Sequence, residues 1–254
     1  MNPTISVAVH ALADLSRFLL QSLDRIERRG LKSADYQDYF THLQITAEKL
    51  LAEKLDKAGK LSQITWQLDL ISQKSFFLHN YPSCFSSLIL YKQKKVYGCV
   101  IYNLLTQDVY HAVSGFGARN NTRRIRVSKQ YYTESYRTEK YILALDHAAV
   151  SYYQVQPFKQ WLVTGSSMQD IVNLASGFID GVITLSLNAT QFQVAQLLLQ
   201  EAGALTESIP ANIKSHAQNT INQHIETEQE KKIVPLISAN QYVLTHLKQD
   251  LCLI

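Results

Sequence analysis

The feature that most constrains the fold is a series of three β-strand patterns, at residues 88–91, 96–102 and 109–113, separated by short polar turns. Each pattern is rich in aliphatic and aromatic residues, and the turns read Lys-Gln-Lys-Lys and Thr-Gln-Asp. Strands joined by such short connections pair in the antiparallel sense. The sequence therefore predicts a β-meander over about 85–114, and residues 124–127 are expected to add an edge strand.

Two helices and a further strand are expected before this meander. Apolar residues recur at helical spacing from Ser6 to Arg29 and again from about Thr41 to Lys57. From Trp66 the apolar positions alternate with polar ones, which is the pattern of a half-buried strand.

The second half alternates between helix and strand patterns. The expected elements are a helix at 168–177, a strand at 181–187, a helix at 190–202, a polar helix-compatible stretch at about 211–232 and a helix at about 240–249. We therefore expect one domain over residues 1–254, with a subdomain of helices and antiparallel sheet over about 1–130 and an alternating α/β subdomain over about 131–254.

The composition is that of an ordinary cytoplasmic protein. Charged residues make up 18% of the 254-residue chain and the net charge is only +4, which is a weak indication for nucleic acid. No apolar run reaches the roughly 20 residues of a membrane span, and no signal peptide is recognised. Cys84, Cys99 and Cys252 lack metal-ligand spacing, so reduced thiols and no membrane contact are expected.

The segment from Trp66 to Pro82 carries the most specific motif, WQLDLISQKSFFLHNYP. It resembles the signature W-x-x-D-P-x-D-G-T-x-N-F-x-H-x-x-P of the inositol monophosphatase family. Four further stretches resemble the family in the same order: the N-terminal helix, 115–128, 165–181 and 193–203. The resemblance covers most of the chain and is strongest to the bacterial SuhB-type branch. It implies an α/β (α+β) fold, the layered α/β/α/β/α sandwich of the inositol monophosphatase and fructose-1,6-bisphosphatase type.

The chain departs from the family at the residues that hold Mg²⁺. The second signature aspartate is replaced by Ser72, the Gly-Thr pair by Gln73-Lys74, and the late metal-binding aspartate by Gln191. The family's Glu-Glu loop is shortened and lacks the pair, and the positions of two further acidic residues fall on Gln44 and Thr184. Of the family's metal ligands, the resemblance leaves only the Asp69 carboxylate and the Ile71 carbonyl.

These losses predict that the family chemistry is absent. Mg²⁺ requires near-octahedral oxygen ligands at about 2.0–2.1 Å and usually takes them from carboxylates and phosphates. Removing one electrostatic element of an active site costs about two to three orders of magnitude in rate. We therefore expect no intact catalytic residue, with Asp69, Ser72, Lys74 and Gln191 as vestiges, and no cofactor. The alternative is a residual or altered Mg²⁺-dependent inositol or sugar phosphate monoesterase.

Two local features at this site each allow two interpretations. Asp69 either closes a turn at the end of its strand or pairs with Lys74, whose ammonium would replace the metal. The stretch Gly165-Ser166-Ser167 either presents backbone donors to a polyol ligand or forms a tight turn in which a serine caps the next helix.

Four arginines lie within eight residues, at Arg119, Arg123, Arg124 and Arg126. They form either a solvated sheet edge or a binding face for RNA or an acidic protein. The family resemblance implies a homodimer, to which we expect residues 81–126 to contribute. It also implies a regulatory role in transcription antitermination, through contact with proteins of the transcription machinery.

Overall fold

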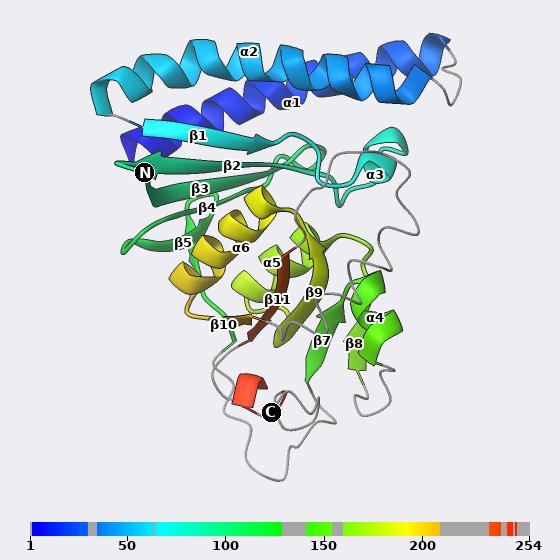
Figure 1. Cartoon of the computed structure of the whole chain (residues 1–254), viewed down its shortest axis with the longest axis vertical. Helices are drawn as coiled ribbons and strands as arrows, with labels where there is room; N and C mark the ends of the chain where they lie inside the picture. The colour runs from blue at the N-terminus through cyan, green and yellow to red at the C-terminus, as the bar shows by residue number, and fades with distance from the viewer. Residues whose placement is uncertain are drawn as a thin grey trace.

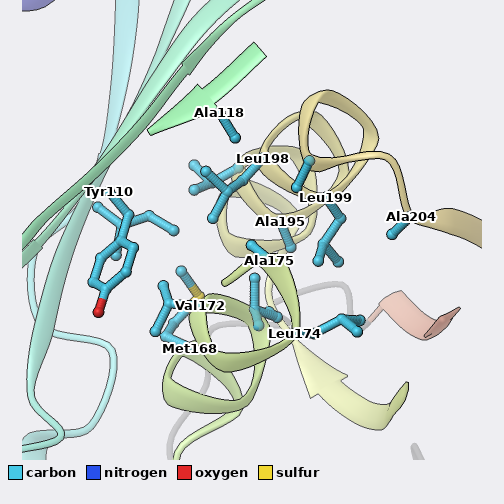
Figure 2. Packing of buried hydrophobic residues seen from close by; sticks show 14 of the residues in the cluster. Tyr110, Ala118, Met168, Val172, Leu174, Ala175, Ala195, Leu198, Leu199 and Ala204 are labelled. Carbon is cyan, nitrogen blue, oxygen red and sulfur yellow. The ribbon is translucent and has the colours of Figure 1, made fainter. Parts of the chain in front are cut away.

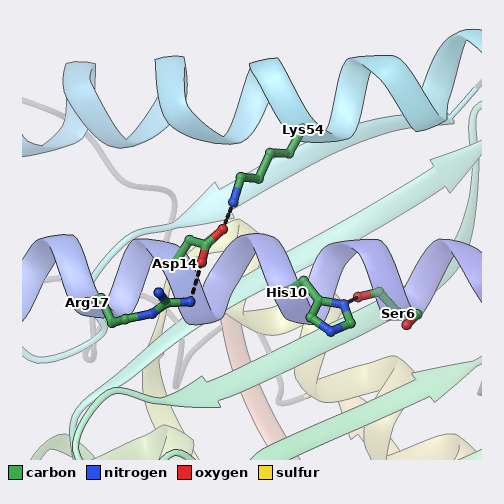
Figure 3. Close-up of polar contacts among 5 residues, drawn as sticks. All are labelled: Ser6, His10, Asp14, Arg17 and Lys54. Atoms are coloured by element: carbon green, nitrogen blue, oxygen red, sulfur yellow. Dashed lines mark hydrogen bonds and ion pairs between the residues drawn. The ribbon is translucent and has the colours of Figure 1, made fainter.

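The computed structural model describes residues 2–29, 35–62, 64–128, 141–153, 160–208, 234–239, 243–245 and 247. Its elements stack in layers of alternating helix and sheet (Figure 1). Helices α1 (Pro3–Arg29) and α2 (Tyr36–Ser62) form the first layer. Figure 3 shows one link between them, in which Asp14 of α1 forms ion pairs with Arg17 and with Lys54 of α2.

The second layer is an antiparallel sheet of six strands in sequential order. Its strands are β1 (Ile64–Asp69), β2 (Phe85–Lys92), β3 (Lys95–Asn103), β4 (Val109–Val113), β5 (Gly117–Asn120) and β6 (Arg123–Ile125). The short helix α3 (Lys74–Leu78) lies between β1 and β2. The predicted meander is thus confirmed. The strand expected from Trp66 is β1, the edge strand expected at 124–127 is β6, and β5 was not predicted.

Helices α5 (Ser167–Ala175) and α6 (Ala189–Ala202) form the middle layer, between this sheet and a second one (Figure 1). The second sheet has the order β10-β11-β9-β7-β8. Its strands are β7 (Ile142–Leu145), β8 (Gln160–Leu162), β9 (Gly181–Leu187), β10 (Leu205–Ser208) and β11 (Val234–Ala239). Helix α4 (His147–Tyr153) packs on β7 and β9. The layered α/β sandwich that the sequence predicted is confirmed.

The core fills the spaces between layers, because neighbouring residues of the first sheet face opposite sides. Leu88 packs under α1 and α2, whereas Ile89 packs against α5 and α6. Figure 2 shows the second of these clusters, in which Tyr110 and Ala118 meet Leu198 and other side chains of α5 and α6. Because both faces of these strands are buried, they appear in the sequence as short aliphatic and aromatic runs bounded by polar turns.

Several expectations concern residues outside the described ranges. The polar stretch at 211–232 and Cys252 lie there, and the expected last helix is described only at 243–245 and 247, which are helical. Cys84 and Cys99 are buried free thiols, and burial raises the pKa of each to about 12. Among the described helices, none has the length and apolar character needed to cross a membrane.

Candidate functional site

The Asp69 carboxylate lies at the end of β1, beside the first turn of α6, and is buried. One of its oxygens accepts hydrogen bonds from Ser72 Oγ at 2.8 Å and from Gln191 Nε2 at 2.9 Å. The other accepts from Asn188 Nδ2 at 2.9 Å. The structure therefore brings together Asp69, Ser72 and Gln191, three of the positions singled out in the sequence. It adds Asn188, which the sequence reasoning missed.

The start of α6 fixes the direction in which both amides point. Asn188 is the N-cap residue, and its side-chain oxygen accepts a hydrogen bond from the backbone N–H of Gln191 at 2.9 Å. The side-chain oxygen of Gln191 accepts in return from the backbone N–H of Asn188 at 3.1 Å. This capping box occupies the two amide oxygens and turns the two NH₂ groups toward Asp69. The N-x-x-Q spacing before an apolar helix was the signal that could have identified Asn188.

This arrangement does not fit a divalent cation. A metal site presents lone pairs inward, but the two amide nitrogens around Asp69 are hydrogen-bond donors with no lone pair to offer. Within the described part of the chain, no group of three or more His, Cys, Asp or Glu side chains could hold a metal ion. Ile71 follows in the loop after β1, with its side chain buried. The site is thus built to satisfy one carboxylate with neutral donors.

Lys74 begins α3, and its ammonium lies over the ring of Phe40 in α2, 4.8 Å from the ring centroid. A cation at this distance from an aromatic face is stabilised by the ring quadrupole. The preceding residue, Gln73, donates its side-chain N–H to the carbonyl of Gly165. The Gln-Lys pair that replaces the family's Gly-Thr thus connects the β1 loop to α2 and to the loop before α5.

The stretch Gly165-Ser166-Ser167 forms a tight turn into α5. Gly165 has φ +77°, and a Cβ atom there would lie 2.8 Å from Cζ of Phe76, so both conformation and space favour glycine. Ser166 is the buried N-cap residue, whose hydroxyl accepts from the backbone N–H of Gln169 at 3.4 Å. Of the two interpretations of this stretch, the serine-capped turn is the one that these contacts describe.

A second polar cluster surrounds Asp146, at the end of β7. One oxygen of its carboxylate accepts from Thr184 Oγ1 at 2.7 Å and from the backbone N–H groups of Leu185 and Ser186. Thr184 stands where the resemblance places the family's inositol-binding glutamate, and its hydroxyl also lies 3.1 Å from Ser167 Oγ. No sequence motif pointed to Asp146, because its donors come from a strand almost forty residues away.

Asp170 lies in the first turn of α5 and is also buried. Burial raises the pKa of this carboxyl group to about 7, against a hydrogen bond from Thr164 that lowers it, and the nearby charge of Asp146 raises it further. The hydroxyl of Thr164 lies 2.8 Å from Oδ1 of Asp170. Around neutral pH this carboxyl group is therefore only partly ionised.

The arginine cluster lies away from these polar clusters. Arg119, Arg123, Arg124 and Arg126 are all exposed, on β5, on β6 and directly after β6. In the order of the first sheet, β6 and the β1 strand that ends in Asp69 are at opposite edges. Any binding by the arginines therefore concerns a surface separate from the Asp69 site.

Comparison with known proteins shows the family. The model of the inositol monophosphatase family matches residues 18–241. The chain is 23% identical over 240 residues to the Nus factor SuhB of Buchnera aphidicola, covering 86% of this chain and 88% of the relative. It is 24% identical to the inositol-1-monophosphatase of Rhizobium meliloti, covering 87% and 92%.

Solved structures show the same fold. The crystal structure of the extragenic suppressor protein suhB from Bartonella henselae has a TM-score of 0.71 at 24% identity and covers 99% of each chain. The inositol monophosphatase from Anabaena has a TM-score of 0.70 at 16% identity, covering 100% of this chain and 98% of the other. From the matched motifs, the layered fold and these likenesses together, the chain belongs to the inositol monophosphatase family.

Proposed function

We propose that this protein is a catalytically inactive member of the inositol monophosphatase family that acts in the cytoplasm by binding proteins, in a regulatory role in transcription antitermination. The observation that carries the first part is the set of hydrogen bonds at Asp69. Two amide NH₂ groups and one hydroxyl donate to the carboxylate that, in the family motif, faces Mg²⁺. A cation placed there would have to displace these donors and would gain only one charged ligand.

The regulatory part of the proposal is supported by the relatives. Several of them are named Nus factor SuhB, among them those of Buchnera aphidicola and Vibrio cholerae. The relative from Rhizobium meliloti is named as an inositol-1-monophosphatase. The alternative function to be tested is therefore residual hydrolysis of a phosphate monoester.

A phosphatase assay tests the inactive state. Purified protein is incubated with inositol 1-phosphate, with Mg²⁺ or with EDTA, and phosphate release is followed beside the Asp69→Asn variant. We expect the wild type and Asp69→Asn to give the same background signal under each condition, because contaminating phosphatases do not depend on Asp69. Turnover that needs Mg²⁺ and disappears in Asp69→Asn would show that the protein is an enzyme.

Ser72→Asp alone should not restore hydrolysis in the same assay, since Gln191 and the missing Glu pair are unchanged.

Titration calorimetry tests the same site without relying on activity. We expect no Mg²⁺ binding tighter than millimolar that is lost on Asp69→Asn.

The regulatory role is tested by affinity capture from the native host under crosslinking. Transcription proteins should be enriched over a capture with the Rhizobium enzyme, which has the same fold; equal recovery on both would speak against the role.

A further inference from the structure

The last two strands of the first sheet have one face that extends beyond the helical layer. Tyr110 and Ala118 point from the sheet toward α6 (Figure 2). Because side chains alternate along a strand, their neighbours His111 and Arg119 face the opposite side, the side on which α1 packs over β2 and β3. Arg124, which is directly opposite Arg119 in the pairing of β5 with β6, faces the same way.

The pairing register places these residues in a single row across the sheet. The row runs through directly paired positions in the order Leu68, Leu88, Val100, His111, Arg119 and Arg124. Its apolar members pack in the cluster beneath α1 and α2, whereas the two arginines are exposed. The row therefore changes from apolar to cationic where the helices stop covering the sheet.

The Arg124 side chain extends toward the turn that carries an exposed aromatic residue. Its guanidinium extends over Gly117, where a Cβ atom would lie 3.0 Å from Nη2. The preceding residue, Phe116, is 77% exposed at the tip of the β4–β5 turn. Glu201 of α6 holds this turn by accepting from the backbone N–H groups of Gly115 and Gly117, both at 2.7 Å. The exposed aromatic and the guanidinium of Arg124 thus lie at the same end of β5, where Glu201 anchors the turn.

The arrangement is unfavourable for the isolated fold. Like charges directly opposite each other on neighbouring strands destabilise a sheet. The charge of Arg119 also acts on the adjacent His111, whose pKa is lowered mainly by burial and further by this arginine, against a hydrogen bond with the Asn121 carbonyl. Within the fold, Arg119 donates to the neutral carbonyl of Thr122 at 2.8 Å, which does not compensate its charge. The two positive charges at this point of the row are therefore explained better by an anionic partner than by the stability of the sheet.

The composition of this face favours a protein over RNA as the partner. Exposed Phe and Arg together are typical of protein interfaces, and they supply many of the residues that dominate binding energy. Binding to an RNA backbone depends on many phosphate contacts, but here a carboxylate, Glu201, holds the turn that carries Phe116. Two exposed guanidiniums on one face of the sheet, with an exposed aromatic at the adjoining β4–β5 turn, match carboxylates that flank an apolar side chain.

We propose that the face formed by Phe116, Arg119 and Arg124 is the docking surface for an acidic protein segment that carries an apolar side chain between its carboxylates. This inference rests on the proposed protein-binding function and names the chemistry of the partner. The two carboxylates would engage the guanidiniums, and the apolar side chain would cover the Phe116 ring.

Fluorescence anisotropy with a defined probe tests the proposal. The probe is a fluorescein-labelled peptide in which glutamates flank a single leucine, compared with the same peptide carrying serine in place of leucine and with single-stranded oligouridylate. Arg119→Gln and Arg124→Gln should each weaken binding of the leucine peptide by about tenfold, and so should Phe116→Ser. The serine peptide should bind more weakly to the wild type and be insensitive to Phe116→Ser.

Arg123→Gln is the matched control. It removes the same charge from the same strand, but Arg123 is paired with Asn120, on the face that Ala118 shares. Its affinity for the peptide should equal that of the wild type. The thermal midpoints of Arg119→Gln and Arg124→Gln should be equal to or above the wild-type value, because each removes a like-charge contact.

Three outcomes would overturn the proposal: no binding of the leucine peptide by the wild type, equal weakening by Arg123→Gln, or tighter binding of oligouridylate than of either peptide. None of these would show that the protein is a phosphatase. Conversely, Mg²⁺-dependent hydrolysis that requires Asp69 would refute the proposed inactivity and leave the peptide measurements unaffected. The two hypotheses can therefore fail separately.

Discussion

Gln191 donates to Asp69 from a position where an aspartate would repel it. Restoring the family residue with Gln191→Asp should therefore destabilise the protein in the absence of divalent cations, by about 2–4 kcal/mol, since a buried hydrogen bond is replaced by like charges. The free energy of unfolding in urea at neutral pH measures the effect. Gln196→Asp makes the same change at an exposed position of α6 and should cost much less. Equal stability of Gln191→Asp and the wild type would mean that the Asp69 contacts contribute nothing.

Asp170 gives the protein a stability that depends on pH. Its pKa is raised from 3.8 to about 7 in the folded protein, so the folded state keeps a proton that the unfolded state has lost. The contribution of this group to stability therefore falls as the pH rises from about 4 to about 7. Asp170→Asn keeps an oxygen for Thr164 and should be more stable than the wild type by on the order of 1–3 kcal/mol at about pH 8. The difference should vanish near pH 4; a constant difference at both pH values would contradict the assignment.

At the scale of elements, the first turn of α6 joins the two halves of the chain through Asn188. This side chain both caps the helix and donates to Asp69. Asn188→Asp keeps the capping oxygen but removes the donor, whereas Asn188→Ala removes both. A lost cap costs about 1 kcal/mol. We expect Asn188→Asp to be destabilised at neutral pH by at least this amount although its cap is intact, as measured by urea unfolding. If Asn188→Asp were as stable as the wild type, the whole contribution of Asn188 to stability would come from capping.

The way each element is buried determines whether the sequence could predict it. The meander was recognisable because its strands are apolar runs bounded by polar turns. Helix α6 was recognisable because a glycine ends it: Gly203 has the left-handed conformation, with φ 88°. Strands β7 and β8 were not predicted, because Ile142–Leu145 and Gln160–Leu162 are only four and three residues long, too short to give a clear pattern. Helix α2 extends beyond the predicted 41–57 to Tyr36 and Ser62.

The residues of the candidate site likewise fall into two groups, those that the sequence could assign and those that required the fold. Asp69, Ser72 and Gln191 could be assigned because they occupy positions of a motif. The direction of the Gln191 amide depends on the capping box, and the contacts of Asp146 depend on how β7 and β9 pair, so both required the fold. The four arginines were recognised as a cluster. Only the strand register separates Arg119 and Arg124 from Arg123, because alternation assigns them to opposite faces of the sheet.

At the scale of the whole molecule, one apolar strip is suited to pairing with a second copy. Trp161, Leu162 and Val163 are each more than 40% exposed, on β8 and directly after it. The strip continues through Gly165, which packs against Phe76, to Tyr81, whose ring centroid lies 4.6 Å from that of Phe76 and which is 49% exposed. Among the described strands, β8 is an outer strand of its sheet, and an exposed apolar outer strand is prone to pair with another chain.

We predict a homodimer whose interface buries this strip, so that residues 81–126 contribute to it through Tyr81. Light scattering at micromolar concentration should give twice the chain mass of 28.9 kDa. Trp161→Ser and Tyr81→Ser should each weaken the dimer by about tenfold or more, because large aromatic side chains dominate interface energies. Phe116→Ser removes an aromatic that is even more exposed, but from the β4–β5 turn, and should leave the dimer intact. A monomeric wild type would refute the dimer, and dissociation by Phe116→Ser alone would assign the dimer contact to the face proposed for the acidic segment.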